Sequence, residues 1–112
     1  HDGYETVKRW IGNHTGLSAI FCASDTLAMG ALLALDEKDI RVPEEFSIVG
    51  FDGLPFSRYL VPPLTTVSQP TQEKGKQAAK MLIDQIEGRQ EKVVQKYLEP
   101  VLTVRGSTGK VL

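Results

Sequence analysis

The chain has 112 residues, of which 41% are hydrophobic and 24% are charged, and its formal net charge at pH 7 is −1. This size fits one globular domain with a modest core, and the interspersed charges exclude a basic nucleic-acid footprint on this chain. The longest apolar run is too short to span a bilayer. A single cysteine excludes an internal disulfide framework and favours a reduced, cytosolic setting.

The first segment has the spacing of a helix. Tyr4, Val7 and Ile11 recur at helical intervals, and Gly12 with Asn13 then supplies a stop signal. The chain has no initial Met and enters this helix within a few residues. We therefore expect the sequence to be a piece of a longer protein.

The next segments follow the pattern strand, helix, strand. Residues 18–23 are apolar without alternation, which predicts a strand covered on both faces. Residues 24–26 supply helix-capping side chains. The helix predicted over residues 26–38 is apolar almost all the way round, so a second buried side is expected. Residues 46–51 are again apolar, and this order predicts a parallel βαβ unit.

The second half of the chain is less regular. Residues 53–63 are a proline-rich loop with an unusual aromatic content, and residues 64–68 are predicted to be extended. A further helix is expected over residues 71–86 because apolar residues share one face and Gly88 follows its end. Residues 93–98 and 101–105 are predicted as two more extended segments.

Polar side chains follow both apolar strands. Ser24 comes after the first and Asp52 ends the second. Ligands of open parallel sheets bind at the carboxyl ends of the strands, so these two residues are expected to share a crevice. A carboxylate fixed there can accept hydrogen bonds from the hydroxyl or amine donors of a small ligand. The alternatives are that Asp52 is only a turn residue and that Ser24 and Asp25 are only helix caps.

Enzymatic and metal chemistry are weakly supported. Cys22 lies in the middle of a strand and is expected to be buried, and His1 and His14 lack partners at metal-ligand spacing, so no metal and no cofactor are predicted. The chain has no phosphate loop, nucleophile elbow or dinucleotide motif. A phosphotransferase with Asp52 as its nucleophile remains an alternative, although residues 53–55 offer it no metal-binding carboxylate.

Four segments, in order, resemble the effector-binding core of bacterial transcription regulators of the lac-repressor and galactose-repressor family. They are SAIFCASDTLAMGALLAL, IRVPEEFSIVGFDG, VPPLTTVSQP with the helix after it, and VRGST. The resemblance implies an α/β fold with a parallel sheet in three αβα layers, of the type I periplasmic-binding-protein-like kind.

The resemblance also implies how the chain is organised. Residues 1–68 would form part of the C-terminal lobe, residues 69–98 would cross to the N-terminal lobe, and residues 99–112 would return as a strand. The helix-turn-helix domain of the family would be absent from this chain. Because earlier strands of the lobe would precede His1, we expect an exposed sheet edge and exposed apolar surface.

Site residues follow from the resemblance by position. Ser24, Asp52 and Gln69 fall on the family's effector-binding positions, with Gln69 at the hinge, and many relatives have Asn where this chain has Ser24. The family's homodimer contact falls on Met29, Leu32, Leu33, Asp36, Phe56, Tyr59 and Leu60. The alternative for Phe56 and Tyr59 is that they fold back onto their own domain.

The implied function is the sensing of a small molecule, a sugar or a related metabolite, by a cytoplasmic, dimeric regulator that is not an enzyme and that binds operator DNA through another domain. An effector held between the lobes would favour one relative orientation of the two. A periplasmic sugar-binding protein of a transport system is the alternative. The sequence before His1 distinguishes them, since a regulator has a helix-turn-helix there and a transport protein a signal peptide.

Overall fold

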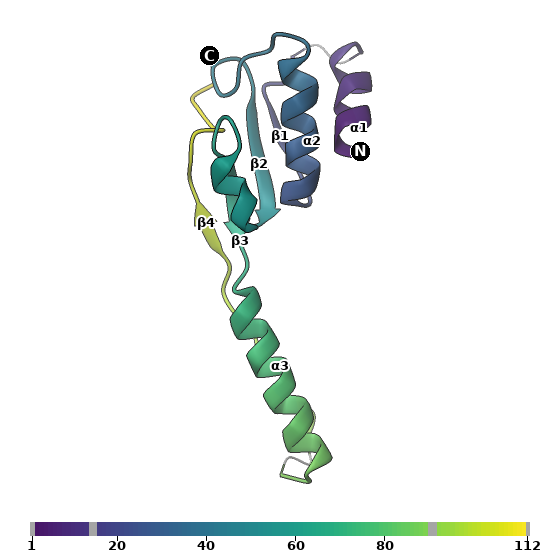
Figure 1. The fold of residues 1–112 in the computed structure, drawn as a ribbon, viewed down its shortest axis with the longest axis vertical. Helices are drawn as coiled ribbons and strands as arrows, with labels where there is room; N and C mark the ends of the chain where they lie inside the picture. The colour runs from purple at the N-terminus through teal and green to yellow at the C-terminus, as the bar shows by residue number, and fades with distance from the viewer. Residues whose placement is uncertain (1, 14–15, 90–91, 112) are drawn as a thin grey trace. The chain divides into compact units, whose positions relative to one another are not determined.

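The computed structural model describes residues 2–13, 16–89 and 92–111 (Figure 1). Its elements, in chain order, are α1 (Asp2–Ile11), β1 (Ala19–Phe21), α2 (Asp25–Asp36), β2 (Ser47–Asp52), the 3-10 helix η1 (Pro55–Tyr59), β3 (Thr65–Ser68), α3 (Thr71–Ile86) and β4 (Val101–Thr103). The chain divides into two compact units. The first unit is His1–Ser68 with Val101–Leu112, and the second unit is Gln69–Pro100.

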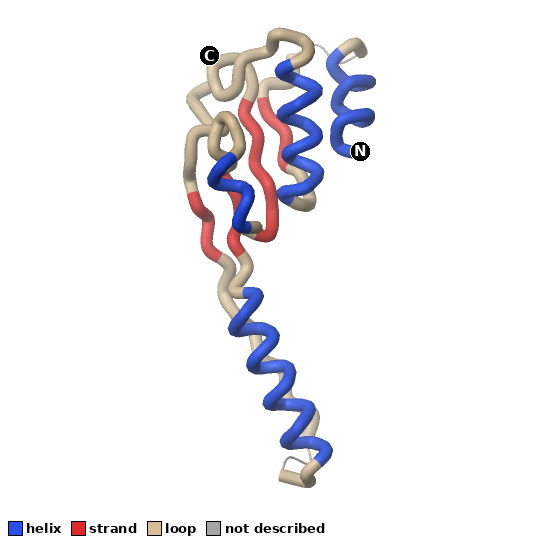
Figure 2. Tube along the Cα trace, in the orientation of Figure 1, coloured by secondary structure: helices blue, strands red, loops and turns tan. Residues whose placement is uncertain are grey.

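The four strands form one sheet in the order β1-β2-β3-β4 (Figure 2). β1, β2 and β3 are parallel, which confirms the predicted βαβ unit. β4 is antiparallel to β3 and places Val101 opposite Ser68, so the sheet is mixed. The two strands that flank the second unit in sequence are therefore hydrogen-bonded neighbours.

Helix α2 begins at a capped turn. Ser24 has an extended backbone (φ −153°), and its Oγ accepts a hydrogen bond from the amide of Leu27 at 3.1 Å, which satisfies one of the orphan donors of the first turn. The buried side of α2 is lined by Ala28, Ala31 and Leu35, which are fully enclosed in the core. The alanines let the helix lie close to the sheet.

Helices α1 and α2 lie side by side and in close contact (Figure 1). A Cβ on Gly3 would collide with the backbone of Leu27, and a Cβ on Gly30 would lie 2.7 Å from the amide nitrogen of Tyr4. Glycine at these two positions lets the helix backbones approach. Val7 of α1 reaches the core across this contact.

One prediction about β1 is wrong for the residues that the structure describes. Ile20 packs against the core, whereas Phe21 is 63% exposed and Ala19 is exposed as well. Successive strand residues point to opposite faces, and the described residues cover only the Ile20 face of this strand. Phe21 makes an edge-to-face contact with Phe51 at a centroid distance of 6.5 Å. The strand is therefore covered on one face, with an apolar aromatic pair on the other.

The segment after β4 ties two strands together. The buried Oγ of Ser107 donates to the carbonyl oxygen of Ile48 at 2.6 Å and accepts from the amide of Thr65 at 2.8 Å. Arg105 Nη1 donates to Ser57 Oγ at 2.9 Å and to the carbonyl oxygen of Leu64 at 2.8 Å. The closing segment thus holds β2, β3 and η1 together.

The second unit consists of α3 and the segment that follows it. Leu82, Ile83 and Ile86 form an exposed apolar side of α3, as the helical spacing predicts. Residues 93–98 were predicted to be extended, and they form neither helix nor strand. The β-branched pair Val93-Val94 raises strand propensity, but a strand also requires a hydrogen-bonded neighbour.

Candidate functional site

Two polar turns lie at one edge of the sheet. β1 and β2 are parallel neighbours, and the amide of Cys22 extends their pairing by donating to the carbonyl oxygen of Val49 at 2.8 Å. Ser24 follows the carboxyl end of β1, and Asp52 is the last residue of β2. Parallel strands put their carboxyl ends at the same edge, so the fold brings these two turns together.

Ser24 is a helix cap in this structure. Its Oγ accepts from the amide of Leu27, so one acceptor position of the hydroxyl is occupied. The hydroxyl hydrogen stays available as a donor. One lone pair of the oxygen also stays available, so Ser24 can still donate one hydrogen bond to a ligand or accept one while it caps the helix.

Asp52 has an unusual backbone. Its φ is +122°, and the next residue, Gly53, has a φ of +75°. Positive φ is costly for a residue with a Cβ and occurs where the surroundings impose it, often at functional sites. A Cβ on Gly53 would lie 2.7 Å from the Cα of Ser68, so the chain turns tightly against β3. The half-buried Asp52 is thus held in a strained turn at the sheet edge.

Sequence reasoning treated Asp25 only as a cap, but the structure gives it a larger part. Asp25 is fully buried, and its Oδ2 accepts from the amide of Leu54 at 2.7 Å while its Oδ1 accepts from Thr66 Oγ1 at 2.5 Å. A Cβ on Gly50 would collide with this carboxylate. Glycine inside a strand often marks the close approach of another group, so Gly50 was the signal that could have revealed Asp25.

Gln69 belongs to the second unit. It directly follows β3 in sequence, it is half-buried, and its Oε1 accepts a hydrogen bond from Lys74 Nζ at 2.9 Å. This bond holds the amide side chain against the first turn of α3. The assignment of Gln69 to the effector site stays a prediction.

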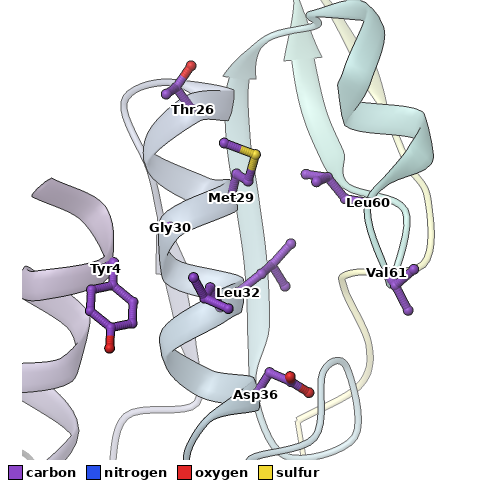
Figure 3. A pocket seen from close by; sticks show the side chains of 9 residues that line it. Tyr4, Thr26, Met29, Gly30, Leu32, Asp36, Leu60 and Val61 are labelled. Atoms are coloured by element: carbon purple, nitrogen blue, oxygen red, sulfur yellow. The ribbon is translucent and has the colours of Figure 1, made fainter. Parts of the chain in front are cut away.

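A second candidate surface is an open groove of about 720 Å³ beside α2 (Figure 3). Figure 3 shows Met29 on α2 facing Leu60 in the loop after η1, with Asp36 at the far end of the helix. Met29 is 43% exposed and Leu33 is 53% exposed, whereas Leu32 is largely buried in the core. The apolar second side of α2 therefore lines this groove.

The two aromatic residues predicted for the dimer contact, Phe56 and Tyr59, are not among the residues that line this groove, and they differ in exposure. Tyr59 is 77% exposed, so its ring does not fold back onto the first unit. Phe56 is half-buried. Of the two aromatic residues predicted for the dimer contact, Tyr59 is therefore exposed and Phe56 is partly covered.

Other reactive groups give no further site among the described residues. Cys22 is buried, and burial raises the pKa of its thiol to about 11, so the nucleophilic thiolate is scarce at neutral pH. Within the described ranges, no three His, Cys, Asp or Glu side chains gather as a metal site requires. His1 and His14 lie outside these ranges. None of the helices described is both long and apolar enough to cross a membrane.

Comparison with known proteins identifies the family. The model of the periplasmic binding protein-like domain matches residues 1–108. The chain therefore belongs to the periplasmic binding protein-like domain family.

Within this family the chain is similar to transcription regulators. It is 40% identical over 115 aligned residues to the HTH-type transcriptional repressor PurR of Haemophilus influenzae (strain PittEE), covering 99% of this chain and 34% of that protein. The chain thus spans about a third of the length of the curated relatives it matches.

Solved structures agree with this similarity. A LacI family transcriptional regulator from Enterococcus faecium with bound ribose has a TM-score of 0.87 and 32% sequence identity, over 95% of this chain and 39% of that one. The lac repressor dimer bound to operator and the anti-inducer ONPF has a TM-score of 0.86 and 29% identity, over 95% of this chain and 37% of that one. These findings confirm the predicted α/β, periplasmic-binding-protein-like fold and the resemblance to effector-binding domains of LacI-type regulators.

Proposed function

We propose that the chain is the effector-binding and dimerisation portion of a cytoplasmic, LacI-type, DNA-binding transcription regulator, and that it has no catalytic role. The observation that carries this proposal is the strained Asp52 at the edge where β1 and β2 end. The similarity to repressors along 99% of the chain supports it. Residues 1–68 and 99–112 are assigned to the C-terminal lobe and residues 69–98 to the N-terminal lobe.

The proposed effector site uses three side chains. Asp52 accepts hydrogen bonds from the ligand, Ser24 donates one from its hydroxyl, and Gln69 acts at the hinge. A carboxylate suits a pair of sugar hydroxyls or the N–H edge of a nucleobase equally well. The ribose complex of the Enterococcus faecium regulator supports a sugar. The effector acts by binding one lobe orientation better than the other, since equal binding would shift nothing.

Thermal-shift titration of the full-length protein tests this proposal. Ribose, lactose and guanine serve as probes, because each offers paired donors to a carboxylate. A probe that binds the folded state at about 100 times its Kd adds about 2.7 kcal/mol to the free energy of unfolding. The Asp52→Asn variant is expected to lose this shift, because the amide offers only one acceptor oxygen where the carboxylate offers two.

Asp39→Asn is the matched control for that titration. Asp39 is exposed, and its φ of +56° is one that asparagine tolerates. The substitution removes the same charge as Asp52→Asn does. Its melting shift with the probes should equal that of the parent. If Asp52→Asn and Asp39→Asn retain the same shift, Asp52 does not bind the effector.

The groove beside α2 is proposed as the homodimer contact. The residues assigned to it are Met29, Leu32, Leu33, Asp36, Phe56, Tyr59 and Leu60. An isologous contact requires one self-complementary patch on each subunit, and the exposed apolar side of α2 provides such a surface. The lac repressor dimer, a structural relative, supports this assembly.

A periplasmic sugar-binding protein is the second candidate, because the matching family model describes a periplasmic binding protein-like domain. Both candidates predict sugar binding, so a DNA measurement separates them. A regulator shifts its affinity for operator DNA when the effector is added, whereas a transport protein has a signal peptide before the fold and binds no operator.

A further inference from the structure

We propose that Asp25 is a positioning residue that holds the strained turn carrying Asp52 in its ligand-binding conformation. This inference rests on the proposed function and assigns a role to a residue that does not itself touch the ligand. Asp25 acts through its hydrogen bond to the backbone amide of Leu54, two residues after Asp52.

Complete burial is the first observation. The Asp25 side chain is 0% exposed, and a buried carboxylate is costly unless hydrogen bonds replace its hydration. Both carboxylate oxygens are used, one by Leu54 and one by Thr66. The residue also lies in the first turn of α2, where the helix dipole favours a negative charge. The surroundings of Asp25 thus replace the hydration that its carboxylate loses on burial.

Asp25 and its two partners belong to three different segments of the sheet edge. Asp25 follows β1, Leu54 follows β2, and Thr66 lies within β3. One carboxylate therefore fixes the relative positions of three chain segments at the edge where the site lies. A residue needed only for α2 would require no bond to the turn after β2.

Leu54 is the point at which this support reaches the site. Its amide donates to Asp25 Oδ2, and its carbonyl oxygen accepts from Ser57 Oγ at 2.7 Å. It lies two residues after Asp52, whose φ is +122°. A strained residue keeps its conformation only where the surrounding structure fixes it. The Asp25 bond holds the far side of this strained turn.

Gly50, within β2, lies against the Asp25 carboxylate. Any side chain there would enter the space of the Asp25 carboxylate and would come within 2.9 Å of Leu64 Cδ2. The absence of a side chain at Gly50 of β2 therefore leaves the space that the Asp25 carboxylate occupies. The buried position of the Asp25 side chain thus depends on a glycine at position 50.

The test compares Asp25→Asn with the Asp39→Asn control by NMR of the labelled protein, at a temperature where both are folded. The variant retains the size of the side chain but loses one acceptor and the charge. We expect the exchange rate of the Leu54 amide to rise about ten- to a hundredfold, with a change in the Cα shift of Asp52. The amide of Ile48, which is bonded to the carbonyl oxygen of Ser107, reports the core and should stay protected.

A binding arm uses ribose and guanine as probes on the same variants. Asp25→Asn should weaken whichever probe the parent binds by about tenfold or more, while Asp39→Asn binds as the parent does. Unchanged Leu54 exchange and an unchanged Asp52 shift in Asp25→Asn would overturn the positioning role. If the parent binds no probe, the proposed function loses its support, and the NMR arm alone decides the role of Asp25.

Thr66 provides a second route if Asp25→Asn does not fold. Thr66→Val removes the hydroxyl that donates to Asp25 Oδ1 and keeps the shape of the buried side chain, whereas Thr66→Ser keeps the hydroxyl. We expect faster Leu54 exchange and an Asp52 shift change in Thr66→Val that Thr66→Ser largely restores. Equal spectra of the two variants around Asp52 would contradict the proposal.

Discussion

The Oγ of Ser107 donates a hydrogen bond to the carbonyl oxygen of Ile48 at 2.6 Å, across a sequence separation of 59 residues. The same oxygen accepts from the amide of Thr65, so one hydroxyl joins the central strands β2 and β3. Ser107 is fully buried, and water cannot replace it. The end of the chain is therefore part of the core of the first unit.

Ser107→Ala should destabilise the first unit strongly. The change leaves the amide of Thr65 and the carbonyl oxygen of Ile48 each short of a partner, and each buried unpaired group costs about 1–3 kcal/mol. We expect the free energy of unfolding in urea to fall by about 2–4 kcal/mol. Ser18→Ala, at an exposed serine, should change it by less than about 0.5 kcal/mol. Equal losses in both variants would contradict this account.

Asp52→Gly should be more stable than Asp52→Ala. Both variants lack the carboxylate, so they differ only in the backbone cost of a φ of +122°. Glycine adopts positive φ freely. We therefore expect the free energy of unfolding of Asp52→Gly to be about 1–2 kcal/mol higher than that of Asp52→Ala. In an ordinary strand the order is reversed. Thermal denaturation of the two variants measures this difference, and the ordinary order would show that the turn is unstrained.

Gly50→Ala and Gly75→Ala should have opposite effects. The Cβ at position 50 collides with Asp25, and overpacking of this kind costs about 1–3 kcal/mol. At position 75, on the exposed side of α3, nothing lies within 4 Å of a new Cβ. There the gain in helix propensity is about 1 kcal/mol. Circular dichroism during heating reports both, and a harmless Gly50→Ala would contradict the close approach of Asp25.

Leu33→Asp tests the proposed dimer surface. Leu33 is half-exposed beside the groove, so a charge there should leave the fold intact and separate the subunits, because an isologous contact brings two such charges together. Leu17→Asp, at a leucine of similar exposure away from the groove, should leave the dimer intact. Sedimentation velocity distinguishes the two, and dimerisation of Leu33→Asp at the affinity of the parent would reject this surface.

Cys22 should react slowly and make stability fall at high pH. Burial raises the pKa of its thiol to about 11, against about 8.5 in an unfolded chain. Alkylation by iodoacetamide at pH 8 should be roughly a hundredfold slower in the folded protein than in urea.

The pH dependence of this thiol has a defined sign. The folded state retains the proton to higher pH, so the Cys22 contribution to stability is complete below about pH 8.5 and is lost as pH rises towards 11. The melting temperature of the parent should therefore fall more steeply over this range than that of Cys22→Ala. Parallel pH curves would contradict it.

Local patterns predicted the βαβ unit because its helix and strands are specified by residues near one another in sequence. The Ser24 cap and the apolar periodicity set where α2 begins, and two apolar runs set β1 and β2. The predicted start at residue 26 differs from the observed start at Asp25 by one residue.

Long-range contacts were beyond the reach of those patterns. The burial of Asp25 depends on Leu54 and Thr66, which lie 29 and 41 residues away. The antiparallel pairing of β4 depends on where the chain returns after the second unit. Likewise, the exposure of Phe21 depends on which elements cover the sheet, and apolar composition alone does not specify them.

The pairing of Ser68 with Val101 makes residues 69–100 an insertion within a β-hairpin. Antiparallel neighbours can be joined by two residues, and Asn-Gly is a preferred pair for such a turn. Replacing the insertion by Asn-Gly should therefore yield a shortened chain in which β3 and β4 form a continuous hairpin and Ser107 keeps its hydrogen bonds to Ile48 and Thr65. The second unit is thus inserted between two strands, β3 and β4, that pair with each other within the first unit.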